Sequence, residues 1–185
     1  VATYTMMQLL DRIKQFQTSL LELGVARGVL ALPAPRMAAL PAFSAEGAAP
    51  ENLFSHFVTE PEITDVARDL YVSGFYNQSV GEAMKALDKF IQEKSGCDDR
   101  SGTVLMTHVF GDTKPILVWG KRKTQSEKDE HKGYLHLFTG SMLGVRNPVT
   151  HEHNWIDTAE EALECIVFAQ HLLRKAKKAS IVDKI

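Results

Sequence analysis

The stretch that decides the fold is Gly133–His153, GYLHLFTGSMLGVRNPVTHEH. Its first part predicts an amphipathic helix, because apolar and small side chains recur there at helical spacing: Tyr134, Leu137, Phe138, Ser141, Met142 and Val145. The residues Arg146–Pro148 then predict a helix stop, since proline lacks a backbone N–H and its ring opposes the preceding turn. His151 and His153 follow at once, so we expect an apolar helix to end beside a cation, an amide and two imidazoles.

The predicted stop decides whether Arg146 and His151 can meet. On a continuous helix they would lie about 140° apart with about 7.5 Å of rise. If Pro148 ends the helix and Asn147 caps a new turn, the chain doubles back and both side chains point into a common space. The free N–H groups of that turn would also favour a phosphate.

The residue types at this point suit one chemistry. A guanidinium that holds a phosphate, an imidazole that moves a proton and an orienting amide suffice for metal-free phosphodiester cleavage. His151 would deprotonate a ribose 2′-hydroxyl or protonate the leaving 5′-oxygen. Arg146 would stabilise the charge that develops around phosphorus.

Helices are predicted on both sides of this stretch. The clearest runs from residue 77 to about residue 94, with Asp88 among the charged residues of its solvent face. A shorter helix is expected to begin at Pro61, and residues 103–110 to form one or two helical turns. Downstream, Asp157 is expected to cap the last helix.

The remaining segments predict little β-structure. The apolar run Ile116–Trp119 could form a strand, so we expect at most one short β-hairpin. Residues 121–132 carry mixed charge and no apolar side chain, which indicates a solvated loop leading into a helix. A phosphate-binding role for this segment is the less favoured alternative. The sum is an all-α bundle.

The N-terminal third differs in composition from the rest. Residues 4–23 predict a helix with an apolar stripe, and residues 28–50 carry repeated proline and alanine, which indicates a connecting strap. We therefore divide the chain into residues 1–58, a helix plus a Pro/Ala-rich strap, and residues 59–185, a helical domain. The stripe is expected to pack within this chain, a partner helix being the alternative.

Composition excludes several classes of protein. A formal net charge of -2 argues against a broad basic surface for nucleic acid, so any such contact should be local. Cys97 and Cys165 match no metal spacing, which favours a reducing cytoplasm and no metal or other cofactor. No apolar run approaches the roughly 18 residues that span a bilayer, so no membrane association is expected.

The residues around the Arg/His pair resemble a known family signature. About one Arg-x(4–6)-His pair is expected by chance in this composition, so the flanking residues carry the interpretation. Phe138–Glu152, FTGSMLGVRNPVTHE, resembles the HEPN superfamily motif and is similar to its Ymh-type branch of bacterial proteins. Gly74–Leu87, GFYNQSVGEAMKAL, is similar to a helix of the same branch. The resemblance covers about residues 60–175.

This resemblance implies a HEPN-like four-helix domain, commonly a homodimer whose two motifs share one composite cleft. It also implies metal-independent RNA cleavage in toxins, abortive-infection systems or other phage-defence modules, with a regulatory protein partner or antitoxin as a further expected partner. Arg146, Asn147 and His151 match the motif and are the expected catalytic residues. Four further residues are candidate substrate contacts: Glu152, His153, Tyr76 and Lys85.

Alternatives remain at each level. Some HEPN relatives bind without cutting, so a non-catalytic module that binds RNA, a nucleotide or a protein partner is the alternative function. Arg146 alone would also suit a helix C-terminus, and His151 alone would suit a plain surface position. For Lys85 the favoured expectation is a solvated helix face.

Overall fold

The computed structural model describes residues 11, 15, 18, 19 and 49–182. The chain divides into two units, residues 1–43 and 44–185, and nearly all of the first lies outside the described residues. The four described residues of the helix predicted at 4–23 are helical, and the rest of that helix and nearly all of the strap lie outside the described range. The boundary at residue 58 stays a prediction.

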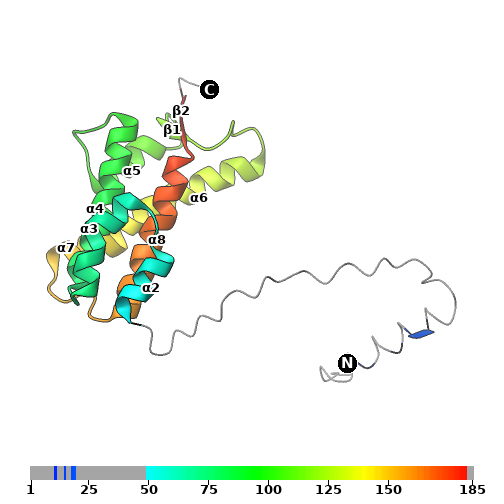
Figure 1. Cartoon of the computed structure of the whole chain (residues 1–185). Helices are drawn as coiled ribbons and strands as arrows, with labels where there is room; N and C mark the ends of the chain where they lie inside the picture. The colour runs from blue at the N-terminus through cyan, green and yellow to red at the C-terminus, as the bar shows by residue number, and fades with distance from the viewer. Residues whose placement is uncertain (1–10, 12–14, 16–17, 20–48, 183–185) are drawn as a thin grey trace. The chain divides into compact units, whose positions relative to one another are not determined.

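Helices dominate residues 49–182, which confirms the predicted all-α class (Figure 1). In chain order they are α2 (Pro50–Phe57), α3 (Pro61–Val72), α4 (Tyr76–Ser95), α5 (Gly102–Phe110), α6 (Gln125–Ser141), the π-helical segment η1 (Met142–Arg146), α7 (Asn147–His151) and α8 (Ala159–Lys177).

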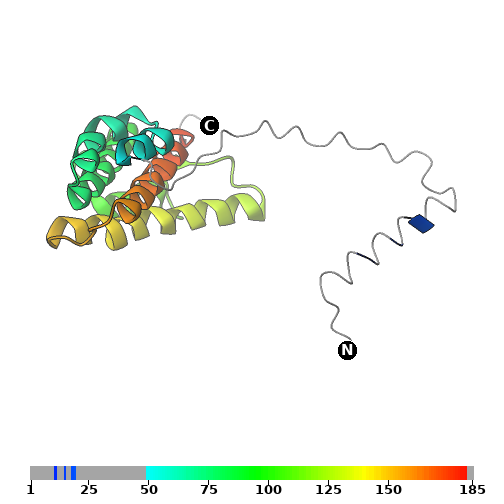
Figure 2. The same ribbon diagram turned by 60° about the horizontal axis from the view of Figure 1, so that its bottom comes forward.

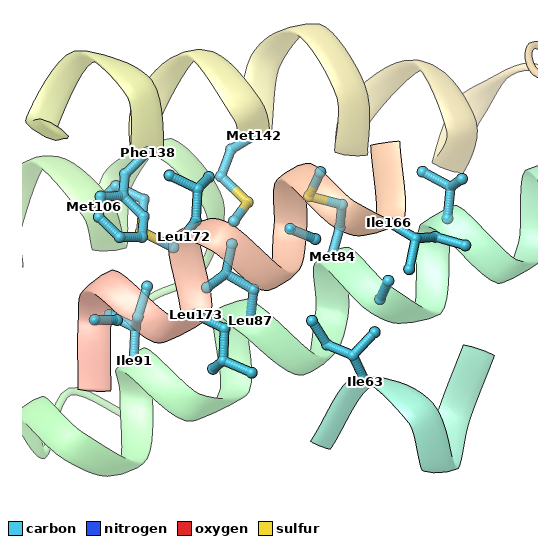
Figure 3. Packing of buried hydrophobic residues seen from close by; sticks show 14 of the residues in the cluster. Ile63, Met84, Leu87, Ile91, Met106, Phe138, Met142, Ile166, Leu172 and Leu173 are labelled. Atoms are coloured by element: carbon cyan, nitrogen blue, oxygen red, sulfur yellow. The ribbon is translucent and has the colours of Figure 1, made fainter. Parts of the chain in front are cut away.

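Helix α4 is the element on which the others pack, since it contacts α3, α5, η1, α7 and α8. Its side chains Met84, Leu87 and Ile91 are fully buried. Figure 3 shows them facing Ile166, Leu172 and Leu173 of α8, with Phe138 and Met142 completing the core from the α6 side. The helix ends at Gly96, whose φ of 72° lies in the left-handed region that glycine adopts without strain.

An aromatic stack fixes α6 against the bundle. The rings of Phe110, Trp119 and Phe138 stack, with centroids 4.6 Å apart for the phenylalanine pair and 4.9 Å apart for Phe110 and Trp119. The Trp119 indole N–H donates to the carbonyl of Lys175 at 2.8 Å. Because these rings come from α5, from the chain after it and from α6, the stack sets the direction in which α6 leaves the core.

Two predictions about element boundaries and one about a buried helix face were wrong. Helix α6 begins at Gln125, inside the segment interpreted as a loop, because Thr124 and Glu127 form a capping box that satisfies the first free N–H groups. The cap of α8 is Thr158, which accepts the N–H of Glu161, and not Asp157. Leu137 of the predicted apolar stripe is 43% exposed.

The expected β-hairpin is instead a two-stranded antiparallel sheet between distant segments. Strand β1 (Leu117–Val118) pairs with β2 (Ser180–Ile181), with Leu117 opposite Ile181. Strand β1 lies within the run Ile116–Trp119 in which a strand was expected, whereas its partner β2 follows α8 and has no local strand signal of its own. Across the part of the chain that is described, no helix combines the length and apolar character required to cross a bilayer.

Candidate functional site

The Arg/His motif lies on a helix that does not stop where the sequence predicted. Residues of α6, η1 and α7 follow one another without a break from Gln125 to His151 (Figure 2). Asn147 has helical angles, φ -64° and ψ -48°, and its N–H donates to the carbonyl of Met142, five residues earlier. The helix ends only at Glu152, whose backbone is extended.

The π-helical segment explains why Pro148 is tolerated. Proline normally ends a helix because it has no N–H to donate and because its ring clashes with the carbonyl four residues before it. A π turn directly before the proline takes five residues into each hydrogen-bonded loop and displaces that carbonyl. The helix therefore continues through Pro148, and the prediction of a stop at this residue was wrong.

This geometry changes the expected site. Residues Asn147–His151 are α-helical, so Arg146 and His151 lie about 140° apart around the axis with about 7.5 Å of rise. They do not converge within one chain. Asn147 caps no new turn, and its N–H, used within the helix, is not offered to a phosphate.

Arg146 instead meets a residue of α4 that the sequence placed on the solvent face. Asp88 is only 5% exposed, and its Oδ2 lies 4.0 Å from Nη2 of Arg146. Its Oδ1 accepts the N–H of Gly102, the first residue of α5, at 2.9 Å. Asp88 was misplaced because its burial arises from two partners, Gly102 and Arg146, which are distant in sequence.

Gly102 allows the three groups to come together. Its φ of 60° lies in the left-handed region, and a Cβ atom at this position would stand 3.1 Å from Nη1 of Arg146. Burial raises the pKa of the Asp88 carboxyl above its ordinary value, while the Gly102 N–H and the Arg146 charge act in the opposite direction. We call Asp88, Gly102 and Arg146 the arginine cluster.

The guanidinium of Arg146 retains unused donors. Its side chain is 24% exposed, its Nε is buried without a hydrogen-bond partner, and within the described residues it donates no hydrogen bond. Asp88 at 4.0 Å balances its charge without occupying its N–H groups. An arginine held in this way can bind an oxyanion that approaches from solvent.

A buried asparagine holds the end of α7 in place. Nδ2 of Asn77 donates to the carbonyls of Val149 at 3.0 Å and Glu152 at 3.4 Å. Its Oδ1 accepts the N–H of Ile156 at 3.3 Å. The segment that carries His151 is thus fixed to the start of α4. We did not single out Asn77 from the sequence, because only its burial distinguishes it from other asparagines near helix starts.

The structure places the other candidate residues in different environments. His151, Glu152 and His153 are exposed at the end of α7 and just after it. Tyr76 is half-buried and packs on Tyr71, with ring centroids 5.5 Å apart.

Lys85 is exposed and pairs with Glu82 at 2.7 Å. It lines a groove between α3 and α4 that also carries the acids Glu62, Asp65 and Glu93 and that includes none of the motif residues. Its role as a substrate contact, like those of Tyr76, Glu152 and His153, stays a prediction. Over the described residues no group of three or more His, Cys, Asp or Glu side chains could hold a metal ion.

Comparison with known families identifies the helical domain. A family model described as "Protein of unknown function (Hypoth_ymh)" matches residues 58–176, which is more than half of the chain. The matched range contains the arginine cluster, Asn77 and His151. No curated protein and no solved structure matches the chain. The Ymh-type resemblance predicted from the sequence is thereby confirmed, while the wider HEPN relationship stays a prediction.

Proposed function

The chain belongs to the Hypoth_ymh family, and on that premise we propose that it is a metal-independent endoribonuclease of the HEPN type. The observation that carries the proposal is the state of Arg146, a partly exposed guanidinium held beside a carboxylate with its donors unused. An exposed imidazole, His151, follows within the same helix. These are an oxyanion ligand and a proton carrier on one rigid support.

The reaction needs no redox partner. The ribose 2′-oxygen attacks phosphorus, its proton passes to a neutral imidazole, and the bond from phosphorus to the 5′-oxygen breaks as that oxygen takes up a proton. His151 carries one of these protons, and Arg146 stabilises the negative charge on the non-bridging oxygens. Asn147, the half-buried residue that follows Arg146, orients the phosphate. A 2′,3′-cyclic phosphate and a 5′-hydroxyl are the expected products.

The divergence of Arg146 and His151 favours a site shared between two copies. In a homodimer the Arg146 of one copy can face the His151 of the other, which one chain alone does not achieve. Val104 and Leu143, on α5 and η1, are 62% and 61% exposed and supply apolar surface near the arginine cluster for such a contact. A toxin or phage-defence setting in the cytoplasm, with a regulatory partner or antitoxin, belongs to the same proposal.

The first experiment incubates purified protein with total RNA in excess chelator. We expect cleavage, a loss of at least about 100-fold in His151→Ala, and wild-type activity in His136→Ala, which removes another exposed imidazole from the same helical rod. The proposal fails if the wild type does not cut RNA or if His151→Ala cuts at the wild-type rate. RNA that is bound and left intact would indicate the non-catalytic alternative.

A second experiment tests the shared site. Arg146→Ala and His151→Ala are each inactive in the proposal, but mixing and reassembling them should restore about a quarter of the wild-type rate. Half of the random dimers are then mixed, and each mixed dimer holds one intact Arg/His pair. No recovery in a preparation that light scattering shows to be dimeric would place both residues of each site in one chain.

A further inference from the structure

A second charged feature lies far from the motif, at the first turns of α6. A cavity of about 540 Å³ opens there between α6 and the chain that precedes it. Figure 1 shows the start of α6 on the opposite side of the bundle from α7. The fifteen residues from His131 in the cavity to Arg146 correspond to about 20 Å along the rod.

Cations dominate the lining of this cavity. Lys121, Arg122, Lys128 and Lys132 face it, and within the described part of the chain none of them forms an ion pair. Two carboxylates, Asp112 and Asp129, also line it, so four positive charges stand against two negative ones.

The Asp129 carboxylate already accepts a hydrogen bond from the Gln125 amide at 2.8 Å. A local excess of two positive charges, in a chain whose formal net charge is -2, marks this cavity as a site for anions.

Two residues give the cavity a defined shape. Arg122 has φ of 50°, which is uncommon for a residue other than glycine, and its Nη1 donates to the carbonyl of Asp112 at 3.3 Å. His131 is 1% exposed and donates through Nε2 to the carbonyl of Phe110 at 2.9 Å. The carbonyl can only accept, so Nε2 carries the proton.

The other imidazole nitrogen of His131, Nδ1, is buried and has no hydrogen-bond partner. An unpaired buried polar atom in the wall of a cavity destabilises the protein by about 1–3 kcal/mol.

Three backbone N–H groups at the start of α6 already donate hydrogen bonds within the protein. The N–H groups of Lys123 and Thr124 donate to the Glu127 carboxylate at 2.7 and 3.0 Å, and the Glu127 N–H donates to Thr124. Those three donors are occupied, and the lysine and arginine side chains of the lining are the groups that would hold an anion in the cavity. Lysine and arginine together suit phosphate, which offers several oxygens to separate donors.

We propose that this cavity binds phosphate groups, carried either by a nucleotide or by a strand of RNA. Clustered cations disfavour a metal ion, and a volume of 540 Å³ lies in the range of small-molecule sites. The proposal does not depend on RNA cleavage at Arg146 and His151. If the ligand is RNA, the cavity holds the strand at a second point about 20 Å from the reacting phosphate.

The test measures ligand affinity by calorimetry and fluorescence anisotropy on the full chain. One arm titrates ATP, and the other titrates a labelled single-stranded oligoribonucleotide into the His151→Ala protein, so that the RNA is not cut. The double variant Lys128→Gln/Lys132→Gln removes two cavity cations. The matched control Lys89→Gln/Lys178→Gln removes two exposed lysines that lie outside the cavity.

We expect at least one of the two ligands to bind, with Kd raised about tenfold in the cavity variant and unchanged within about twofold in the control. In the RNA arm, log K falls as log salt rises, and the magnitude of this negative slope should be smaller by about 1.4 in the cavity variant, because two phosphate contacts are lost. ATP alone would identify a nucleotide site, and RNA alone a strand site.

The proposal is overturned if neither ligand binds or if both double variants bind equally. If the cavity variant binds both ligands with wild-type affinity while the wild type still cleaves RNA, the cavity proposal fails and the proposed nuclease function stands. If the cavity binds ATP or RNA but the wild type cleaves no RNA, the cavity proposal stands and the nuclease function fails.

Discussion

Replacing Gly102 with alanine tests whether the close approach at the arginine cluster positions Arg146. Two effects are expected. The backbone at Gly102 has φ of 60°, which costs an alanine about 1 kcal/mol relative to glycine. The new Cβ would also stand 3.1 Å from Nη1 of Arg146, closer than an ordinary contact of about 3.5–4 Å, so the guanidinium must move by a few tenths of an ångström.

Gly96→Ala is the matched control. Its φ is 72°, so the backbone strain is nearly the same, but a Cβ there meets nothing within 4 Å. Arg146 Nη1 is the end of a flexible side chain, so both variants should lose about 1 kcal/mol of unfolding free energy. For a chain of this size that loss corresponds to a fall of about 2–4 °C in Tm.

The two variants should separate in activity. Displacing a group that binds the reacting phosphate lowers the rate steeply with distance, so we expect RNA cleavage to fall about tenfold in Gly102→Ala and to stay at the wild-type level in Gly96→Ala. Urea unfolding followed by circular dichroism measures the first quantity, and the chelator-resistant cleavage assay measures the second. Equal cleavage by both variants would refute the positioning role of this contact.

Three further predictions concern buried polar groups. Burial raises the pKa of Asp88 above 3.8, so wild-type stability should fall as pH rises from about 4 through that raised pKa; Asp88→Asn should flatten this slope, and unchanged slopes in urea unfolding would contradict the burial effect. Burial lowers the pKa of His131 below 6.5, so stability should fall as pH drops through 6.5 toward that lowered pKa. His131→Gln should reduce the loss of unfolding free energy between pH 7.5 and 5. An equal loss in the wild type and the variant would contradict the burial effect. Asn77→Ala should lower the unfolding free energy by about 1–3 kcal/mol and speed amide exchange at Ile156, with exposed Gln78→Ala as the silent control.

Periodicity was enough to predict most of the helical domain. The buried face of α4 follows from Val80, Ala83, Met84, Leu87 and Ile91, which recur at helical spacing and are all fully buried. The spacing of apolar residues shows which side of a helix is apolar. It does not report which polar residue on the other side will be covered by a neighbour, and for that reason Asp88 was assigned to solvent.

The site depended on interactions that local rules do not contain. Pro148 predicts a helix stop because proline has no N–H and its ring clashes with the preceding turn. The π turn before it allows the helix to continue, and the sequence pattern does not reveal that turn. Gly102 directly precedes the helical turns expected at residues 103–110, and nothing in the local sequence shows that Arg146 lies beside it. Strand β2 forms because β1, more than sixty residues earlier, lies next to it. In each case the missing information was a contact between distant segments.

The π turn also sets the phase of the helix surface. Each hydrogen-bonded loop in Met142–Arg146 holds one residue more than an α-helical loop, so deletion of a single residue there would remove the π turn and bring the Pro148 ring back against the carbonyl four residues before it. Everything beyond the deletion would rotate by about 100° relative to α6. Val149 would leave its place against Gly81, and the acceptors of Asn77 would turn away. In this segment chain length, more than residue identity, determines which way the end of the helix faces.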